Sequence, residues 1–278
     1  MAKPSLPSPE AILAKEAGAR KIAAYSAMAS AVFVVLAMII DATVARANVP
    51  DFDGTDLVQT LSAVQNGDTL PRSFLPAAAQ FTLDHSTSIF LGTLCRTIAV
   101  LLLIPMVLLL VSAVRDRGGQ LGAWVKPAAI IGYVVFGVTA VALVLLQFSV
   151  YRTARDAGFE PADIWDAVRD SPRAAAGLGD FLGRVLAGVT LAMAAVQAIR
   201  VGLLPRMIGY LGLFIAFLFI VPLGPAEILR AFWFSGVAFL IMGRLPNTPE
   251  AWLTGTAVEP ELRQPAQPKK KKGDPEPA

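Results

Sequence analysis

The sequence has very few of the residues that build metal and redox sites. Its only cysteine is Cys95 and its only histidine is His85. One cysteine excludes a disulfide within the chain, and one histidine excludes a metal site with two histidine ligands. Cys95 stands in a hydrophobic segment, which indicates a packing role. We predict neither a metal ion nor a cofactor.

The motifs of common enzyme families are missing as well. The chain has no HExxH, no CxxC, no Walker phosphate-binding loop and no GxSxG. Gly118-Gly119 and the run 177–179 do not follow an expected strand, so they do not indicate a nucleotide-binding loop. No aspartate or glutamate lies in the middle of a hydrophobic segment, where an intramembrane aspartyl protease needs a pair. We predict that the protein is not an enzyme.

Charged residues are scarce too. They make up 16% of the chain, against about a quarter in a typical soluble domain, and the mean hydropathy is +0.60. The longest hydrophobic segment, Ile89 to Val114, contains 26 residues and one charge, Arg96. As a helix it reaches about 39 Å, which exceeds the ~30 Å hydrocarbon core of a bilayer. The chain is therefore predicted to be an integral protein of the lipid bilayer.

Six hydrophobic segments predict an all-α polytopic membrane protein, a bundle of about six transmembrane helices. The last two segments are about 17 and 16 residues long, and the four residues between them predict a tight antiparallel hairpin. Pro105 should bend the second helix. The segments cover about residues 22–40, 89–114, 128–150, 181–199, 207–223 and 228–243.

Two of these segments carry further signals. The first resembles a signal peptide, because Ala45-Arg46-Ala47 imitates a cleavage site. Signal peptides have apolar cores of about 7–15 residues, so the 19 residues here favour an uncleaved helix. The fourth has small residues at three- and four-residue steps, which predicts close packing on another helix. These small residues are Gly183, Ala187, Thr190, Ala194 and Ala198.

Polar stretches lie between and beyond the segments. The tail contains seven prolines and is predicted to be disordered. Its run of four lysines, Lys269, Lys270, Lys271 and Lys272, either contacts anionic inner-leaflet lipids or belongs to a solvated tail. The polar stretches are an N-terminal segment (1–21), two outer loops (41–88 and 151–180) and the tail (244–278).

Both outer loops contain a short pattern that allows two interpretations. DFDGTD (51–56) weakly resembles a calcium-binding loop, but its glycine is misplaced, so a turn followed by a short helix is favoured. Residues 161–170 place Ile164, Trp165 and Val168 on one helical face. This face indicates either a helix at the membrane surface or a helix packed on neighbouring loops.

The distribution of lysine and arginine predicts the orientation in the membrane. Fifteen of the 24 lie in residues 1–21, 115–127, 200–206 and 244–278, whereas six lie in the two outer loops. Cytoplasmic segments of membrane proteins are enriched in lysine and arginine. Both termini are therefore predicted on the cytoplasmic side of the plasma membrane, an N-in/C-in arrangement.

The remaining charges gather towards the outer side. In the predicted orientation, six polar residues fall in the outer third of the bundle. Ionisable residues at membrane depth are costly and usually face the bundle interior with a partner. This outer-leaflet cluster is a candidate ligand site or ion-pair site. Its members are Asp41, Arg96, Gln147, Arg184, Glu227 and Arg230.

The arginines of this cluster differ in their expected partners. Asp180 with Arg184, and Glu227 with Arg230, have the spacing of helical pairs. These two arginines are also shallow enough for their stems to snorkel to the interface. Arg96 has no acid within one helical turn, so its partner is expected to be Asp41, Glu227 or water. Two roles stay open for Arg96, a structural ion pair and a ligand-facing residue.

The last third of the chain resembles a known kind of sequence. The features are the RVGLLPR turn at 200–206, the glycine-containing span after it, and a last helix that ends in Gly243-Arg244 followed by Pro246 and Trp252. Over residues 196–257 the chain resembles uncharacterised multi-pass membrane proteins of high-GC Gram-positive bacteria, related to the DUF4386 type. The resemblance implies a six-helix membrane protein and brings no substrate, activity or site residue.

Two functions are consistent with these patterns. The first is a non-enzymatic membrane scaffold that binds a membrane protein partner, a second copy of the chain or lipid. The second is a small-solute transporter or permease, for an anion, with an outward-facing polar vestibule. The halves show no convincing inverted repeat, which counts against transport. No pattern indicates binding to nucleic acid.

Overall fold

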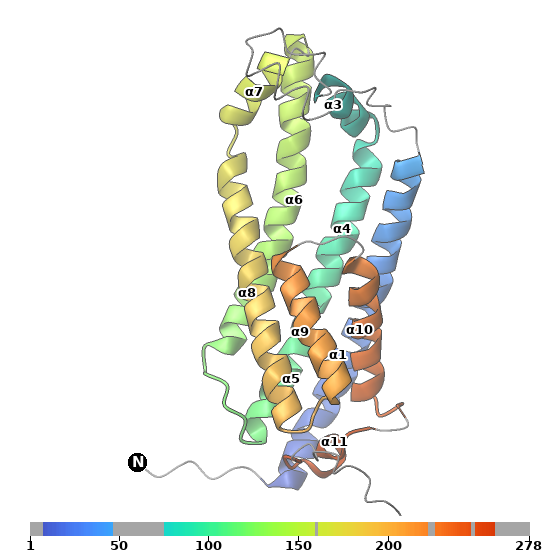
Figure 1. Ribbon diagram of the computed structural model, residues 1–278, viewed down its shortest axis with the longest axis vertical. Coiled ribbons are helices and arrows are strands. Elements are labelled where there is room, and N and C mark those ends of the chain that lie inside the picture. Colours follow the sequence, from blue (N-terminus) through green and yellow to red (C-terminus); the bar gives the residue numbers. More distant parts are fainter. Residues whose placement is uncertain (1–7, 47–74, 159–160, 222–225, 246–247, 259–278) are drawn as a thin grey trace, which may run out of the picture.

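The computed structural model describes residues 8–46, 75–158, 161–221, 226–245 and 248–258. Every secondary-structure element in these residues is a helix, so the all-α prediction is confirmed for this part of the chain. We call the end of the bundle with α3 and α7 the upper end, and the end with α11 the lower end (Figure 1). The helices are α1 (Pro9–Arg46), α3 (Leu75–Asp84), α4 (Ser86–Leu102), α5 (Ile104–Asp116), α6 (Val125–Ala157), α7 (Pro161–Arg169), α8 (Arg173–Arg200), α9 (Arg206–Ile220), α10 (Ala226–Ile241) and α11 (Glu250–Thr254).

Four helical stretches are long and apolar enough to cross a membrane: α1, α4 with α5, α6 and α8. Such helices are compatible with an integral membrane protein. The helices α9 and α10 have 15 and 16 residues, about 22 and 24 Å at the helical rise. Both fall short of the ~30 Å hydrocarbon core. The predicted count of six spans is therefore not confirmed.

The two short helices α9 and α10 pair in opposite directions, as the sequence predicts. The indole Nε1 of Trp233 on α10 donates to the carbonyl of Ile208 near the start of α9, at 2.8 Å. About one turn earlier in α10, Arg230 reaches the carbonyl of Leu218 near the end of α9. The pair occupies the lower half of the bundle and packs on α8 and α1 (Figure 1). Its upper ends therefore lie at a level where the longer helices continue.

The second long stretch is interrupted where its proline predicts. α4 ends at Leu102, α5 begins at Ile104, and Pro105 lies in the first turn of α5. Proline has no N–H to donate, and its ring clashes with the preceding turn of a helix. Leu103, at the break, is 1% exposed. The break therefore lies inside the packed core.

The helices α6 and α8 approach so closely that glycine is required on both. A Cβ atom on Gly132 of α6 would lie 2.7 Å from the backbone N of Ala187, and one on Gly183 of α8 would lie 2.5 Å from the backbone N of Phe136. The predicted packing of the fourth segment is confirmed, because its whole stripe of small residues is buried. The stripe comprises Gly183, Ala187, Thr190, Ala194 and Ala198.

A buried ion pair holds the lower end of the bundle together. The side chain of Arg117, just after α5, is 0% exposed and donates to both carboxylate oxygens of Glu16 on α1, at 2.5 and 3.1 Å. The same guanidinium donates to the carbonyl of Ala251 on α11 at 2.8 and 3.0 Å. Next to it, Trp252 donates to the carbonyl of Leu203 in the turn after α8. These contacts fix α11 on the ends of α1, α5 and α8.

The prediction of a disordered tail from Arg244 onward is wrong for its first part. Residues 248–258 include α11, and Trp252 is 1% exposed. A large aromatic side chain in a polar stretch has apolar surface to bury, and docking of α11 buries it. The lysines Lys269–Lys272 and the DFDGTD segment (51–56) lie outside the described residues.

Several helices extend beyond the hydrophobic segments that predict them. The helix α1 begins at Pro9, inside the N-terminal segment 1–21. The upper end of α6 reaches Ala157 and α8 begins at Arg173, both inside the loop 151–180. The added turns are rich in alanine and arginine, which are strong helix formers in water. Hydropathy therefore marks only the apolar part of each helix.

The amphipathic helix α7 packs on neighbouring helices. This agrees with the second interpretation of residues 161–170, a helix packed on its neighbours. Ile164 is 3% exposed and lies in one buried cluster with Ala79 of α3 and Ala154 of α6. Val168 packs against the same cluster. Ile164 and Val168 of this face are thus packed against other helices of the upper end.

Candidate functional site: a polar pocket above the short hairpin

Arg96 on α4 joins three helices. Its Nε donates to Oε1 of Glu227 on α10 at 2.6 Å, and an Nη2 ion pair links it to Asp41 near the upper end of α1. Both acids expected as partners of Arg96 are therefore in contact with it. The contacts place Arg96 directly above the start of α10.

Arg184 on α8 forms the pair with Asp180 that helical spacing predicts. Its Nε lies 2.7 Å from Asp180 Oδ2, although the N–H does not point at that oxygen, so the contact is an ion pair without a hydrogen bond. The guanidinium lies over the ring of Phe136 on α6, 4.9 Å from the ring centroid. Stacking of this kind attracts the cation to the negative ring face and fixes its plane.

Arg230 on α10 does not form the expected pair with Glu227, whose carboxylate turns to Arg96 instead. Within the described part of the chain, no ion pair of Arg230 with a carboxylate occurs within 4 Å. Its Nη2 donates to the carbonyl of Leu218 in the last turn of α9, where the helix dipole is negative. Its guanidinium stacks on Phe219, 4.7 Å from the ring centroid.

These three arginines surround one cavity of about 370 Å³. Helices α4, α6, α8 and α10 supply its walls, so the site depends on the packing of the whole bundle. A second cavity of about 50 Å³ lies next to it, shares Arg96, Glu227 and Arg230, and reaches the ring of Phe219. We call the larger cavity the polar pocket. Its charged lining residues are Arg96, Asp180, Arg184, Glu227 and Arg230.

Four buried side-chain polar atoms in the described residues have no hydrogen-bond partner, and all belong to this region. They are Tyr133 Oη, Asp180 Oδ1, Arg184 Nε and Arg230 Nε. Tyr133 is fully buried and packs edge-on against Phe219, the ring that also carries Arg230. Buried polar groups in native proteins are nearly always hydrogen-bonded, to protein, water or ligand. Three of the four atoms belong to residues that line the polar pocket, Asp180, Arg184 and Arg230.

The sequence-predicted cluster is only partly assembled here. Arg96, Asp41, Glu227, Arg184 and Arg230 come together, whereas Gln147 lies higher on α6 and donates to the hydroxyl of Tyr151 at 3.2 Å. Gln147 lies three residues beyond Val144, the last residue of α6 that lines the pocket, about 4.5 Å along the helix. The sequence placed Gln147 near the outer end of its helix because it lies near the end of the hydrophobic segment 128–150. The helix α6 continues past that segment to Ala157.

Sequence reasoning missed Tyr133 and the phenylalanine platforms. Tyr133 and Phe136 lie in the charge-free segment 128–150, where aromatic side chains look like ordinary lipid or core residues. Their spacing of three residues places them on one helical face, and that pattern was the available signal. Only the fold brings Phe219 from α9 next to both rings, with centroids 5.9 and 6.0 Å away.

No protein-family model, curated protein or solved structure matches the chain. The resemblance over residues 196–257 therefore stays a prediction. The chemistry of the site has to be argued from its own residues.

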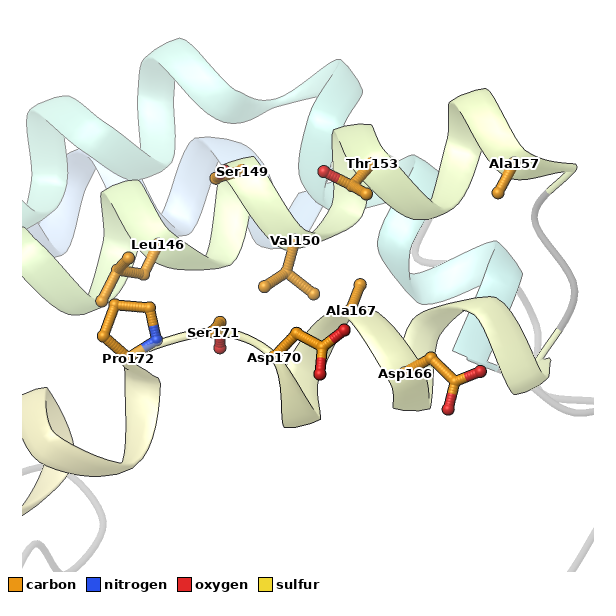
Figure 2. A pocket seen from close by; sticks show the side chains of 10 residues that line it. All are labelled: Leu146, Ser149, Val150, Thr153, Ala157, Asp166, Ala167, Asp170, Ser171 and Pro172. Carbon is orange, nitrogen blue, oxygen red and sulfur yellow. The ribbon is translucent and has the colours of Figure 1, made fainter.

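A larger cavity, of about 460 Å³, lies at the upper end between α6 and α7. Figure 2 shows Thr153 and Val150 on α6, with Ala167 and Asp166 on α7 and Asp170 just after its end across the cavity. Its two carboxylates, Asp166 and Asp170, are four residues apart, and the described residues contain no group of three metal-ligating side chains. This cavity has none of the unpaired buried atoms that distinguish the polar pocket.

Proposed function

We propose that the protein is an integral membrane protein that binds a small solute with an anionic group in the polar pocket. The observation that carries the proposal is the set of unpaired buried atoms at the pocket. Arg230 Nε has no acceptor, and Arg184 Nε lies 2.7 Å from Asp180 Oδ2 without hydrogen-bond geometry; guanidinium N–H groups are strong donors to an anionic acceptor such as a carboxylate. The hydroxyl of Tyr133 is buried in the packing beside the pocket and does not line it.

The proposed orientation places the pocket near the outer side of the plasma membrane. The lower end carries a ring of basic residues, and basic residues favour the cytoplasmic side. Both termini then lie in the cytoplasm. The short helices α9 and α10 enter from that side and turn back within the bundle, as a re-entrant hairpin enclosed by α1 and α8. The basic residues are Lys21, Arg115, Lys126, Arg200 and Arg244.

The pocket favours solute binding over the scaffold hypothesis. A scaffold needs exposed contact surface, whereas the unpaired atoms here are buried within the bundle. Beneath the pocket the core is closed by Leu103, Phe219 and Phe234, each at most 2% exposed. In the proposed orientation this floor separates the pocket from the cytoplasmic side, and transport would require a second conformation that opens it.

Binding is tested by thermal unfolding of the purified protein in nanodiscs. The probes are small carboxylates, including amino acids, with nitrate, phosphate and chloride at one ionic strength. At 100 times its Kd a ligand stabilises the folded state by about 2.7 kcal/mol, so at least one carboxylate is expected to raise the melting temperature. Arg230→Gln is expected to remove that rise. The matched control is Arg152→Gln, which changes an exposed arginine of α6 outside the pocket. An equal response of wild type and Arg230→Gln, or no response to any probe, would refute the proposal.

The orientation has its own test. In a Cys95→Ala background, one cysteine is placed at Asp156 at the upper end or at Glu250 at the lower end, both exposed positions. A membrane-impermeant maleimide added to intact cells should label Asp156→Cys at once and Glu250→Cys only after permeabilisation. The reverse pattern would place the polar pocket on the cytoplasmic side. Labelling of both positions in intact cells would contradict membrane insertion of the bundle.

A further inference from the structure

The polar pocket contains an unpaired acceptor as well as unpaired donors. Asp180 is 8% exposed, and its Oδ1 has no hydrogen-bond partner while its Oδ2 faces Arg184. A simple anion would pair with the guanidinium groups of Arg184 and Arg230 and leave this carboxylate oxygen unpaired. A buried acceptor without a donor is unfavourable. The missing guest therefore needs a donor group next to its acceptor group.

The charges around the pocket point the same way. The lining residues Arg96, Arg184, Arg230, Asp180 and Glu227 carry a formal charge of +1. Asp41, which pairs with Arg96 from outside the lining, brings the set of three guanidinium groups and three carboxylates to zero before any guest arrives. An anion would leave one uncompensated charge in a partly buried site, which is costly. A zwitterion adds no net charge.

The stacking geometry keeps the donors available. Phe136 and Phe219 each cover one face of a guanidinium, at 4.9 and 4.7 Å from the ring centroids. Hydrogen bonds of a guanidinium run in its own plane, so a stacked arginine still presents its N–H edge. Both arginines therefore present N–H groups to an acceptor, such as a carboxylate, that lies in the plane of the guanidinium.

The rest of the lining is mostly apolar, apart from Thr93 and Thr97, whose hydroxyls donate to backbone carbonyls. Val100, Ala140, Leu143 and Val144 line it from α4 and α6. Small-molecule sites combine such apolar walls with a few convergent polar groups, and their volumes are commonly about 300–1,000 Å³. At about 370 Å³ the pocket fits a small molecule with one polar end and an apolar body.

We propose that the polar pocket binds a free amino acid with an apolar side chain. Its carboxylate pairs with Arg230 and Arg184, its ammonium group with Asp180, and its side chain lies against the apolar walls. The inference rests on the proposed function and adds the ammonium group and the apolar body. The headgroup of phosphatidylethanolamine also joins an anionic group to an ammonium group, so the test separates the two sources.

Three probes test the two groups: L-leucine, N-acetyl-L-leucine, which lacks the ammonium charge and adds an acetyl group, and 3-methylbutylamine, which lacks the carboxylate. Binding is measured by melting shifts in phosphatidylglycerol nanodiscs. Leucine is expected to bind at least roughly 10-fold more tightly than either analogue, because each lacks one charge-assisted pair. Asp180→Asn should weaken leucine roughly 10-fold and remove its advantage over N-acetyl-L-leucine. Asp156→Asn, at an exposed position, should leave the ratio unchanged.

Each other outcome has one meaning. If N-acetyl-L-leucine binds as tightly as leucine to the wild type, the zwitterion inference is overturned and anion binding survives. If the amine alone binds, or no probe binds, both proposals fail. If phosphatidylethanolamine nanodiscs stabilise the protein and abolish the leucine shift, the guest is a lipid headgroup and the free amino acid is overturned. The wild-type ratios decide the matter even where Asp180→Asn fails to fold.

Discussion

Arg117→Ala is expected to destabilise the folded protein by about 3–5 kcal/mol, because it leaves the carboxylate of Glu16 buried with only part of its partners. It also removes both donors to the carbonyl of Ala251 and the cation that stacks on Trp252. The loss should appear as a lower melting temperature in nanodiscs. A protease should also cut residues 248–258 faster, because Arg117 holds α11 on the bundle.

The matched control for this change is Lys15→Ala. Lys15 joins the same two parts of the chain through Asp116, at 2.8 Å, but its side chain is 64% exposed. Exposed pairs contribute at most about 1 kcal/mol. Equal effects of Arg117→Ala and Lys15→Ala would show that burial of the first pair has no energetic consequence. Equally fast cleavage of residues 248–258 in both variants would lead to the same conclusion about burial.

Gly183→Ala is expected to destabilise the bundle by about 1–3 kcal/mol, the usual cost of overpacking. The added Cβ would lie 2.5 Å from the backbone N of Phe136, and a helix backbone cannot yield as a flexible side chain can. The helices α6 and α8 must separate, and Phe136, the platform of Arg184, moves with them. Ligand binding in the polar pocket should therefore weaken together with thermal stability.

Gly177→Ala provides the control on the same helix. A Cβ at Gly177 meets nothing within 4 Å, and alanine is a better helix former than glycine by roughly 0.5–1 kcal/mol. This change should raise the melting temperature slightly, so the two substitutions are expected to have opposite signs. A stabilising effect of Gly183→Ala would mean that α6 and α8 separate at little energetic cost.

The sequence predicted the apolar helices well, because a long charge-free segment has few alternatives to a helix in a bilayer. It could not predict that α9 and α10 end inside the bundle. A short apolar segment has the same composition whether it crosses the membrane or turns back within the protein. The polar extensions of α1, α6 and α8 were missed because hydropathy does not register helix formers such as alanine and arginine.

The site was predictable as a set of charges and not as a set of pairs. The sequence named Asp41 and Glu227 as partners for Arg96, but they lie far from it along the chain, and only the fold shows that both are in contact. It paired Glu227 with Arg230 from helical spacing, and the competing ion pair with Arg96 prevails. Unpaired atoms, such as Tyr133 Oη, are a property of packing and have no signature in one sequence.

The position of the short hairpin in the chain has a consequence for biosynthesis. The helix α10 packs on α1, which leaves the ribosome first, and α9 packs on α8. During synthesis, α1 and α8 therefore wait with uncovered faces until the final helices are made. The bundle closes in one late step, when α9 and α10 fill the space and α11 docks at the lower end.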